Sequence, residues 1–495
     1  MGILSIDLGT TNIKAAYYSD DFLEQVIISH PVAYEKNGAT VEFSAEIYFD
    51  TVVGLLRDCI DKAGNGERAD VFQIVLTGQA ESMVVLDKEG NPMRKAISWL
   101  DMRSTKECGE LSRRFESDLC FHVTGQPHII PTWPITKLLW LKRNEPDICE
   151  NAHKYLLIKD YIIYLLTGKL VGEYTIYSFS HYFDIIKKRY WPDILDYCGI
   201  KHCQLPDLVE PCTVIGTLKP DIAKFIGATD TVRVNVGALD HFAGMIGTGN
   251  IRQGVVSESA GTVLSLASLL DKPLFGEYRI PIYAGPFPES YVLLPVCESG
   301  GISLEWFKNA FAEELPYSAI DSGAASRLNT DAPLFLPYIT GNNAPDFDND
   351  ASGVFFGIRA SHDRYDFSLG IMEGVACLLR KNVDFMRKAG IPVQNIISTG
   401  GGSKSALWSQ LKADYTGCPI SVPVDEEAPC FGAALVGAIS EGIYTDYERA
   451  VNSCVKMKRT YNPSKSQYIE KRYELFSKIY TSLSPSFKFH RNIVY

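Results

Sequence analysis

A carboxylate and two hydroxyls stand together at a predicted turn near the start of the chain, in the stretch Asp7-Leu-Gly-Thr-Thr11. Apolar runs flank this stretch at 3–8 and 13–18, so we expect two strands joined in a hairpin. The backbone amides of such a tip, with the hydroxyls of Thr10 and Thr11, can hold phosphate oxygens because glycine leaves the backbone open. Asp7 would then reach a hydrated magnesium ion. The alternative is an ordinary tight hairpin whose threonines satisfy turn amides.

A second tip of the same kind occurs in the stretch 254–269. It again gives an apolar strand, a turn with Gly261 and Thr262, and a second apolar strand. This weak internal repeat predicts two α/β domains, each beginning with a hairpin that carries Gly-Thr at its tip. Two such tips facing each other across an interdomain cleft would hold the two ends of a polyphosphate. The repeat therefore favours the phosphate-binding interpretation of the first tip.

One further carboxylate, Asp240, follows a predicted strand at 232–236 and a turn at Gly237. A carboxylate at the end of a strand can accept the proton of an attacking hydroxyl during phosphoryl transfer. Its position alone favours another role, as N-cap of a helix that begins at His241. The two roles can coexist.

The elements that must position these groups alternate between strand and helix. Apolar spacing predicts helices over 45–63, 134–142, 155–167 and 368–388, and strands over 71–76, 83–87 and 393–398. A chain of 495 residues is longer than one core usually serves, so we expect at least two domains. We place them at 1–247 and 248–495.

The composition is that of a globular protein, with 46% hydrophobic and 22% charged residues. The net charge of −11, without a long basic run, argues against nucleic acid or an anionic membrane as a partner. The 12 cysteines are scattered without CxxC pairs, and the N-terminus has no signal-peptide pattern. These features predict reduced thiols and a cytoplasmic location. A homodimer is the default expectation for the oligomeric state.

Six motifs occur in the order and spacing of one known family: "DLGTT", "WLDMR", "GALDHFAG", "SAGT", "GVFFGI…IMEGVA" and "GGGSKSALWSQLKADYTG". Through these motifs the chain resembles the FGGY carbohydrate kinases from residue 3 to about residue 442. The resemblance implies an α/β fold with two ribonuclease-H-like domains of the actin-like ATPase superfamily, flanking an interdomain cleft. It also implies ATP-dependent phosphorylation of a hydroxyl of a small sugar or polyol, with Mg²⁺.

The resemblance assigns nucleotide-binding roles to several residues. The first phosphate motif contains Asp7, Thr10 and Thr11, and the second contains Gly261 and Thr262, followed by Val where many members carry a smaller residue. The turn Gly400-Gly401-Gly402-Ser403 matches the adenosine site, and the segment with Gly301 and Glu305 matches a further nucleotide contact, where glycerol kinases carry Gln in place of the Glu. Asp240 matches the family's Gly-x-x-Asp motif, which makes it the expected catalytic base and, with Asp7, part of the magnesium site.

The acceptor site is implied by residues of three further segments. Gln79 and Glu81 align with the segment that touches the acceptor, although the Arg of glycerol kinases is missing here. Trp99 and Trp133 would supply apolar walls, and His241, next to the expected base, would contact the acceptor.

Asp101 and Arg103 allow two interpretations, as charged groups of the acceptor pocket or as a structural ion pair. With this set of residues, the expected acceptor is a ketopentose such as xylulose. The alternatives are a glycerol- or erythritol-type polyol kinase and an actin-like switch ATPase without sugar kinase activity.

Overall fold

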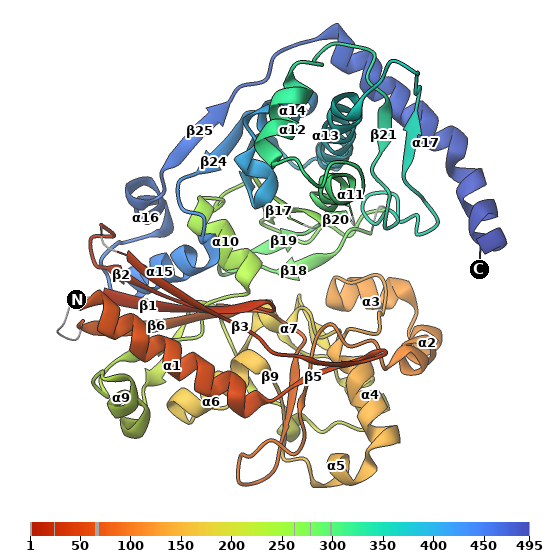
Figure 1. The fold of residues 1–495 in the computed structure, drawn as a ribbon. Helices are drawn as coiled ribbons and strands as arrows, with labels where there is room; N and C mark the ends of the chain where they lie inside the picture. Colours follow the sequence, from red (N-terminus) through yellow and green to blue (C-terminus); the bar gives the residue numbers. More distant parts are fainter. Residues whose placement is uncertain are drawn as a thin grey trace. The chain divides into compact units, whose positions relative to one another are not determined.

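The computed structural model describes residues 2–23, 25–64, 69–261, 263–277, 279–297 and 299–494. The chain forms two compact units, each assembled from three segments (Figure 1). Unit 1 consists of Met1–Ile251, Leu270–Val292 and Glu427–Val455, and unit 2 of Arg252–Leu269, Leu293–Glu426 and Lys456–Tyr495. The domain boundaries 1–247 and 248–495 stay a prediction, because compact units and sequence domains need not coincide.

Unit 1 is built on a mixed sheet that contains the first predicted hairpin. β1 (Gly2–Leu8) pairs antiparallel with β2 (Asn12–Ser19), and β2 pairs antiparallel with β3 (Gln25–Pro31). On its other side β1 pairs parallel with β6 (Val71–Gly78), which pairs parallel with β15 (Arg233–Asn235). With β14 (Val214–Thr217) the order is β14-β15-β6-β1-β2-β3. The predicted hairpin is confirmed, and the parallel strands β1, β6 and β15 end at the same edge of the sheet.

Helices cover both faces of this sheet (Figure 1). α1 (Ala45–Ala63), α6 (Ile158–Thr167) and α9 (Pro220–Ile226) share one core with it, while α15 (Ala428–Ser440) packs on the other face. α1 spans the predicted residues and starts at the cap of Ser44, whose hydroxyl accepts a hydrogen bond from the amide of Ile47 (3.1 Å). The predicted helix over 155–167 begins only at Ile158, because 154–157 form β9. That short apolar run is buried on both sides, and its spacing does not distinguish strand from helix.

α10 (Asp240–Thr248) and α15 pack against each other through two glycines. A Cβ on Gly247 would overlap the carbonyl oxygen of Ala428, and a Cβ on Gly432 would overlap that of Ala243. Backbone therefore meets backbone at this contact, as only glycine allows. Because α15 also packs on β1 and β6, it holds the helix that begins at Asp240 against the sheet.

The other elements of unit 1 include a second sheet with the order β4-β5-β8-β7-β9. Their bounds are β4 (Glu35–Asn37), β5 (Thr40–Phe43), β7 (Met83–Leu86), β8 (Ala96–Ile97), α2 (Thr105–Arg114), α3 (Ser117–Thr124), α4 (Pro134–Asn144), α5 (Pro146–Asn151), β9 (Lys154–Leu157), β10 (Val171–Glu173), α7 (Tyr174–Tyr177), β11 (Phe183–Asp184), β12 (Arg189–Tyr190), α8 (Pro192–Cys198), the 3₁₀ turn His202–Gln204, β13 (Asp207–Val209), β18 (Ile282–Ala284), β19 (Tyr291–Leu293) and α16 (Tyr447–Cys454).

Unit 2 repeats the strand pattern of unit 1. β16 (Gly254–Ala260) pairs antiparallel with β17 (Leu264–Leu270) and parallel with β23 (Val393–Thr399). β23 pairs parallel with β24 (Ile420–Pro423), which pairs antiparallel with β25 (Met457–Tyr461). The internal repeat predicted from the sequence is thus confirmed in the strand order.

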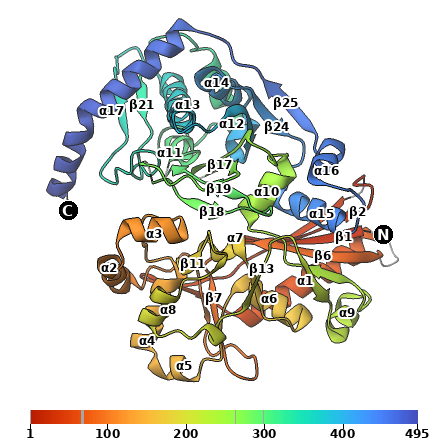
Figure 2. The ribbon, with the colours of Figure 1, turned by 180° about the vertical axis from the view of Figure 1, so that it is seen from behind.

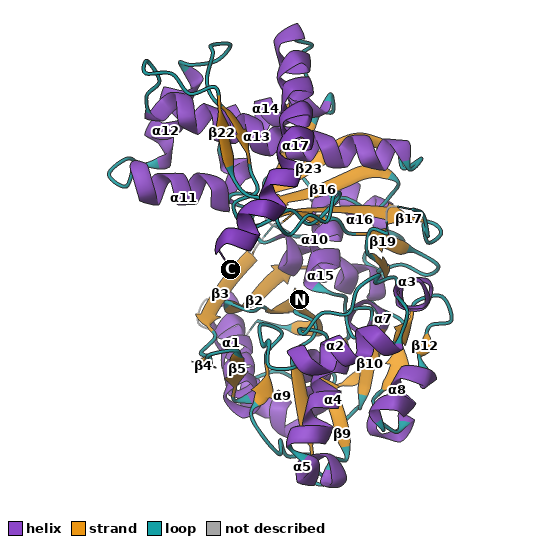
Figure 3. Cartoon of the chain, turned by 90° about the vertical axis from the view of Figure 1, so that its right-hand side faces the viewer, coloured by secondary structure: helices purple, strands orange, loops and turns teal. Residues whose placement is uncertain are grey.

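The helices of unit 2 pack around α13 (Arg364–Lys388), as Figure 2 shows. This helix starts four residues before its predicted position, because the side chain of Asp363 caps it. Figure 3 shows α17 (Gln467–Val494) as a long helix beside α13 and α14 (Ala406–Thr416). The remaining elements are β20 (Val296–Cys297), α11 (Ile302–Phe311), α12 (Tyr317–Ala325), β21 (Leu334–Leu336), β22 (Val354–Phe356) and the 3₁₀ turn Gly401–Lys404. Among the described residues, no helix combines the length and apolar character needed to cross a membrane.

The glycine contact gives a first prediction. Gly432→Ala should lower the free energy of unfolding by about 1–3 kcal/mol, because the new methyl group must push α10 away from α15. Gly54→Ala in α1 is the matched control: its Cβ would meet no atom within 4 Å, and alanine favours a helix over glycine by roughly 1 kcal/mol. Urea unfolding of both variants measures the difference. If Gly432→Ala lowered the free energy of unfolding no more than Gly54→Ala does, the α10–α15 contact would not be tight.

Candidate active site

Asp7 lies at the end of β1 and is buried, facing Lys14 across the hairpin register. Its Oδ1 atom has no hydrogen-bond partner within the described part of the chain. Burial, and after it the charge of Asp240, raises the pKa of Asp7 to about 7, against the opposing charge of Lys14. A buried carboxylate oxygen without a partner is costly, so the geometry fits a cation or a water held by one.

Lys14 is a part of this site that the sequence analysis missed. Its ammonium group forms an ion pair with Glu427, directly before α15. Burial lowers the pKa of Lys14, but the hydrogen bond to Glu427 and the charges of Glu427 and Asp7 raise it overall. The cation therefore stays charged and links the first hairpin to the helix that supports α10. No local pattern could have indicated a pair that is 413 residues apart.

Asp240 is the first residue of α10 and not its N-cap, which is Leu239, so the capping role expected from its position is wrong. Two hydrogen bonds between threonine hydroxyls and the backbone hold the loop that leads to it. The hydroxyl of Thr77 donates to the carbonyl of Ala238 (2.9 Å), and the amide of Leu239 donates to the hydroxyl of Thr175 (2.8 Å). Leu239 also forms a parallel bridge with Gly78 at the end of β6. The loop before Asp240 is thus tied to the sheet edge at which β1 and β6 end.

A buried ion pair supports this loop from behind. Lys159 and Glu173 are both fully buried and lie 2.8 Å apart, and Glu173 also accepts a hydrogen bond from the hydroxyl of Thr175 (2.7 Å). The same hydroxyl receives the amide of Leu239. Removing one partner of such a pair leaves an uncompensated buried charge, so the pair holds the loop firmly.

His241 stands next to the predicted base and is half exposed. Its Nδ1 lies 3.1 Å from Oδ1 of Asp240. Desolvation lowers the pKa of His241, but the hydrogen bond to Asp240 and the charges of Asp240 and Asp7 outweigh it and raise the pKa. His241 can therefore orient the carboxylate of Asp240 and still face an acceptor.

The tip of the first hairpin is connected to a predicted wall of the acceptor site. The indole N–H of Trp99 donates to the hydroxyl of Thr10 (2.7 Å), and Tyr34 donates to the carbonyl of Thr10 (2.9 Å). Thr11 is exposed. Of the two threonines, Thr11 is the one whose side chain is open to a phosphate in this structure, while Thr10 also braces Trp99.

Glu81 is the most unusual of the predicted acceptor residues. Its backbone has φ 70°, a left-handed conformation that is costly for a residue with a side chain. Its Oε2 atom is buried and has no partner in the described ranges. Burial raises the pKa of Glu81 to about 8, against the opposing charge of Lys137 and a hydrogen bond from Thr132. Lys137, which the sequence analysis did not single out, is fully buried in α4 and donates to the carbonyl of Ser98 (2.8 Å).

Three other predicted acceptor residues are held by protein groups. Gln79 donates to the carbonyl of Gly9 (3.2 Å) and accepts from Ser82 (2.7 Å). Asp101 is fully buried, and its carboxylate accepts two hydrogen bonds from the side chain of Arg103 (2.9 and 2.7 Å). The ion pair that the sequence left as one of two interpretations is therefore present. A role of these residues in contacting the acceptor stays a prediction.

Trp133 is almost completely buried at the start of α4. Its indole N–H donates to the carbonyl of His128 (3.2 Å), and its ring packs against Phe179 and His181. It belongs to an aromatic cluster that also contains Tyr283.

Unit 2 brings together the glycines predicted to bind the nucleotide. The amide of Gly301 donates to the carbonyl of Gly261 (2.7 Å), and a Cβ on Gly400 would lie 3.2 Å from the backbone of Ala260. The tip of the second hairpin, the start of α11 and the glycine turn after β23 are thus neighbours. Gly401, Gly402 and Ser403 form a 3₁₀ turn in which the hydroxyl of Ser403 donates to the carbonyl of Gly400 (2.8 Å). Glu305 is exposed on α11, and Thr262 lies outside the described residues.

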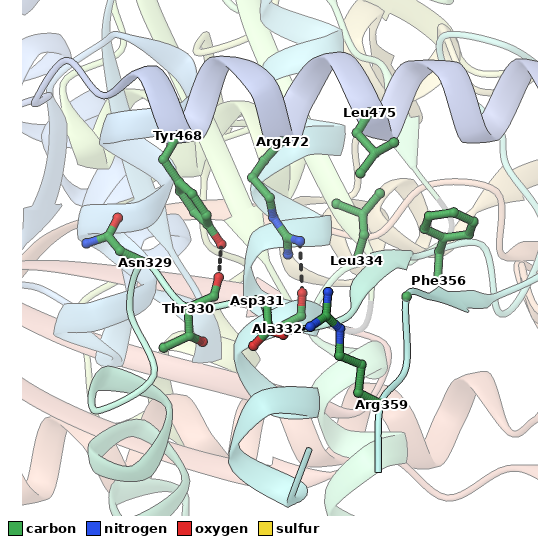
Figure 4. A pocket seen from close by; sticks show the side chains of 11 residues that line it. Asn329, Thr330, Asp331, Ala332, Leu334, Phe356, Arg359, Tyr468, Arg472 and Leu475 are labelled. Carbon is green, nitrogen blue, oxygen red and sulfur yellow. Dashed lines mark hydrogen bonds and ion pairs between the residues drawn. The ribbon is translucent and has the colours of Figure 1, made fainter. Parts of the chain in front are cut away.

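A separate pocket of about 480 Å³ lies in unit 2, beneath α17 (Figure 4). Several of its polar groups bind one another: Tyr468 donates to the carbonyl of Thr330 (2.9 Å), and Arg472 donates to that of Ala332 (2.8 Å). None of the predicted site residues lines it. Its lining consists of Asn329, Thr330, Asp331, Ala332, Leu334, Phe356, Gly357, Arg359, Tyr468, Arg472 and Leu475.

Two α/β units with the same strand pattern and Gly-Thr hairpins define the two-domain fold of the actin-like ATPases. The family models "FGGY family of carbohydrate kinases, N-terminal domain" and "C-terminal domain" match residues 2–247 and 259–441. The chain belongs to the FGGY family of carbohydrate kinases. It is an enzyme of that class, and these kinases use ATP.

Individual relatives agree on the family but differ in substrate. The chain is 27% identical to a xylulose kinase of Bacillus subtilis over 488 residues, which covers 97% of this chain and 96% of the relative. It is also 27% identical to a gluconokinase of the same organism over 497 residues, covering 97% and 95%. A solved structure of a ligand-bound xylulose kinase from Lactobacillus acidophilus has a TM-score of 0.90 at 24% identity and covers 99% of both chains. The last comparison supports the fold alone.

The raised pKa of Asp7 gives a second prediction. Since the ordinary value is 3.8 and the folded value about 7, the folded protein binds more protons than the unfolded chain between these pH values. The contribution of Asp7 to the free energy of unfolding therefore falls as the pH rises through this range. Asp7→Asn removes the buried charge, so without metal or nucleotide it should melt roughly 2–5 °C above wild type at pH 8 and close to wild type at pH 5.

Thermal melting in EDTA at the two pH values measures this effect, and Asp50→Asn, an exposed change on α1, is the control. A stabilisation of Asp7→Asn that is equal at pH 5 and pH 8 would show that ionisation of Asp7 is not its cause.

Proposed function

We propose that this carbohydrate kinase transfers the γ-phosphoryl group of ATP to a hydroxyl of a ketopentose such as xylulose, with Mg²⁺. One observation carries the proposal. Asp7 lies at the end of β1, and the loop that leads to Asp240 is tied to the end of β6, so both carboxylates lie at one sheet edge, and Oδ1 of Asp7 has no partner in the described chain. A base and a cation ligand side by side are what phosphoryl transfer to a hydroxyl requires.

The residues present fit Mg²⁺ better than a metal held by protein alone. Within the described ranges, no group of three or more His, Cys, Asp or Glu side chains is placed to hold an ion. Mg²⁺ usually takes one or two carboxylates and completes its shell with water and substrate phosphates. We assign Asp7 to it through water, with Asp240 nearby. When bound, the ion neutralises charge on the phosphate oxygens.

Asp240 acts as general base in this proposal. The acceptor oxygen forms a bond to the γ-phosphorus while the bond from that phosphorus to the bridging oxygen of ADP breaks, and the hydroxyl proton passes to Asp240. His241 orients the carboxylate through Nδ1, and the loop bonds of Ala238 and Leu239 keep the base at the sheet edge. The hairpin tips with Thr10, Thr11, Gly261 and Thr262 hold phosphate oxygens.

The adenosine part of the nucleotide is assigned to residues of unit 2. We assign the adenosine to the glycine turn at 400–403 and a further contact to the start of α11, at Gly301 and Glu305. Support comes from the hydrogen bond between Gly301 and Gly261, which joins this region to the second tip.

The charges around Glu81 favour a neutral acceptor over an aldonate. A gluconate carboxylate would need an unengaged cation, but the ammonium of Lys137 is bound by the carbonyl of Ser98, and Arg103 is bound by Asp101 and Glu42. Glu81 adds a carboxyl group with an unpartnered oxygen, which can accept a hydrogen bond from a hydroxyl donor. Trp99 and Trp133 then supply walls for a carbon chain, and Asp101, Arg103 and Gln79 hold these segments in place.

The third prediction concerns turnover. With MgATP, D-xylulose should raise ADP release far above the water background, and gluconate should not. Asp240→Asn should lower kcat roughly 100- to 10,000-fold and leave ATP binding unchanged, because only proton transfer is lost. A coupled ADP assay over a panel of ketopentoses, polyols and aldonates decides this. Preference for glycerol or erythritol would replace the ketopentose, and hydrolysis indifferent to every compound would favour a switch ATPase.

The fourth prediction concerns Glu81. Glu81→Gln should raise KM for the acceptor roughly 2- to 10-fold, because a hydrogen bond contributes about 0.5–1.5 kcal/mol and the amide changes its geometry and donor pattern. KM for ATP should not change. Glu150→Gln, an exposed change, is the control. An unchanged acceptor KM would remove Glu81 from the acceptor site without affecting the assignment of Asp240.

A further inference from the structure

His181 is a buried imidazole that the reaction scheme does not use. It lies between α7 and β11, and its exposed fraction is 0%. Neither Nδ1 nor Nε2 has a hydrogen-bond partner among the residues that the structure describes. Buried polar side chains nearly always have such a partner, so an imidazole with two unpartnered nitrogens calls for a group that the protein alone does not supply.

The backbone at His181 is also unusual, and it shares this feature with Glu81. The two residues have φ 64° and φ 70°, in the left-handed region that side chains disfavour. Each carries a buried polar atom without a partner in the described ranges. Strained backbone persists where the surroundings enforce it, and it gathers at ligand-binding sites. Among the described residues of unit 1, Glu81 and His181 are the two that combine both features.

Both residues adjoin a single aromatic wall, which consists of Trp133, Phe179 and Tyr283. The ring of His181 stacks on Trp133 at a centroid distance of 6.2 Å, and Thr132, the residue before Trp133, hydrogen-bonds to Glu81. Phe179, two residues before His181, stacks on Tyr283 at 4.0 Å, and the charge of Glu81 acts on Tyr283.

The wall also reaches the helix of the proposed base. Phe242, two residues after Asp240, packs edge-on against Tyr283 at 6.3 Å. The aromatic wall thus extends from His181 and Glu81 to the start of α10.

A purely structural role explains these features poorly. Packing against Trp133 needs only the ring faces, and an apolar side chain would fill the space without removing two nitrogens from water. Nor does an apolar core position require a left-handed backbone. The imidazole is the group that needs a partner here.

We propose that His181 is a specificity-determining residue for the acceptor, donating one hydrogen bond to its hydroxyl groups and accepting one from them. The inference rests on the proposed function, since it takes the acceptor to lie along the wall of Trp133 and Tyr283.

The charge state of the ring sets the chemistry it can recognise. Burial, with the charge of nearby His128 acting in the same direction, lowers the pKa of His181 to about 3. The ring is therefore neutral near pH 7 and presents one donor and one acceptor. Hydroxyl groups, which donate and accept, complement it fully, whereas a carboxylate can use only the donor. His181 therefore complements a polyhydroxyl chain better than it complements a carboxylate.

The test compares two variants that fit the same backbone. His181→Asn keeps a donor and an acceptor, and His181→Gly removes both, while asparagine and glycine both tolerate positive φ. Each variant and wild type is assayed with D-xylulose and its 1-deoxy, 3-deoxy and 4-deoxy analogues. Melting temperature and ATP binding verify the fold, and His30→Asn, an exposed change on β3, is the control.

In wild type, at least one deoxy analogue should show a kcat/KM at least tenfold below that of D-xylulose. His181→Gly should raise KM for D-xylulose at least tenfold with a smaller change in kcat, and it should abolish the preference for the hydroxyl that His181 binds. His181→Asn should restore much of that preference. If the ratios of all analogues to D-xylulose are the same in wild type and His181→Gly, the proposal is wrong.

The two proposals fail in different ways. If wild type prefers another neutral polyol to every ketopentose, the ketopentose assignment is wrong, and the same comparison with that polyol and its deoxy analogues decides the role of His181. If wild type phosphorylates D-xylulose and the variants keep its discrimination, only the role of His181 is wrong.

Discussion

The contact of α10 with α15 is the constraint on which the catalytic half of unit 1 depends. Gly247 and Gly432 let the two backbones touch, and no side chain of any other residue type fits between them. Since α10 begins at Asp240 and α15 begins directly after Glu427, this contact fixes the distance between the proposed base and the ion pair of Glu427 with Lys14. Lys14 lies opposite Asp7 in the hairpin, so the carboxylate at the end of β1 is placed by the same contact.

Two sets of buried polar groups in unit 1 differ in their partners, and the difference separates support from the proposed chemistry. Lys159 with Glu173, and Asp101 with Arg103, are fully paired and tie loops to helices, as buried ion pairs must be to offset their loss of hydration. Oδ1 of Asp7, Oε2 of Glu81 and the ring of His181 lack partners in the part of the chain that the structure describes. These three residues lie at the sheet edge or along the aromatic wall. The paired groups keep the scaffold rigid, so that the unpaired ones need not move when a ligand arrives.

The sequence predicted what depends on neighbouring residues and missed what depends on distant ones. The two hairpins and α1 follow from apolar spacing, turn glycines and a serine cap, so their positions could be read directly. The segment 154–157 could not, because a short run buried on both sides suits a strand as well as a helix. Lys14 with Glu427 and Trp99 with Thr10 join residues 413 and 89 positions apart, and no spacing rule reaches that far. Lys137 lies in α4, and nothing in the local sequence indicates that this lysine is fully buried.

The hydrogen bond between Trp99 and Thr10 shows why the phosphate and acceptor segments act as one piece. Thr10 belongs to the hairpin tip that we assign to phosphate oxygens, and Trp99 to the wall that we assign to the acceptor. Ser82 strengthens the connection, because its hydroxyl receives the amide of Trp99 and donates to Gln79, which in turn binds the carbonyl of Gly9. A shift of either segment must therefore move the other or break a partly buried hydrogen bond. Alignment of an acceptor hydroxyl with a phosphate to within a fraction of an ångström needs this kind of shared frame, because small misplacements cost large factors in rate.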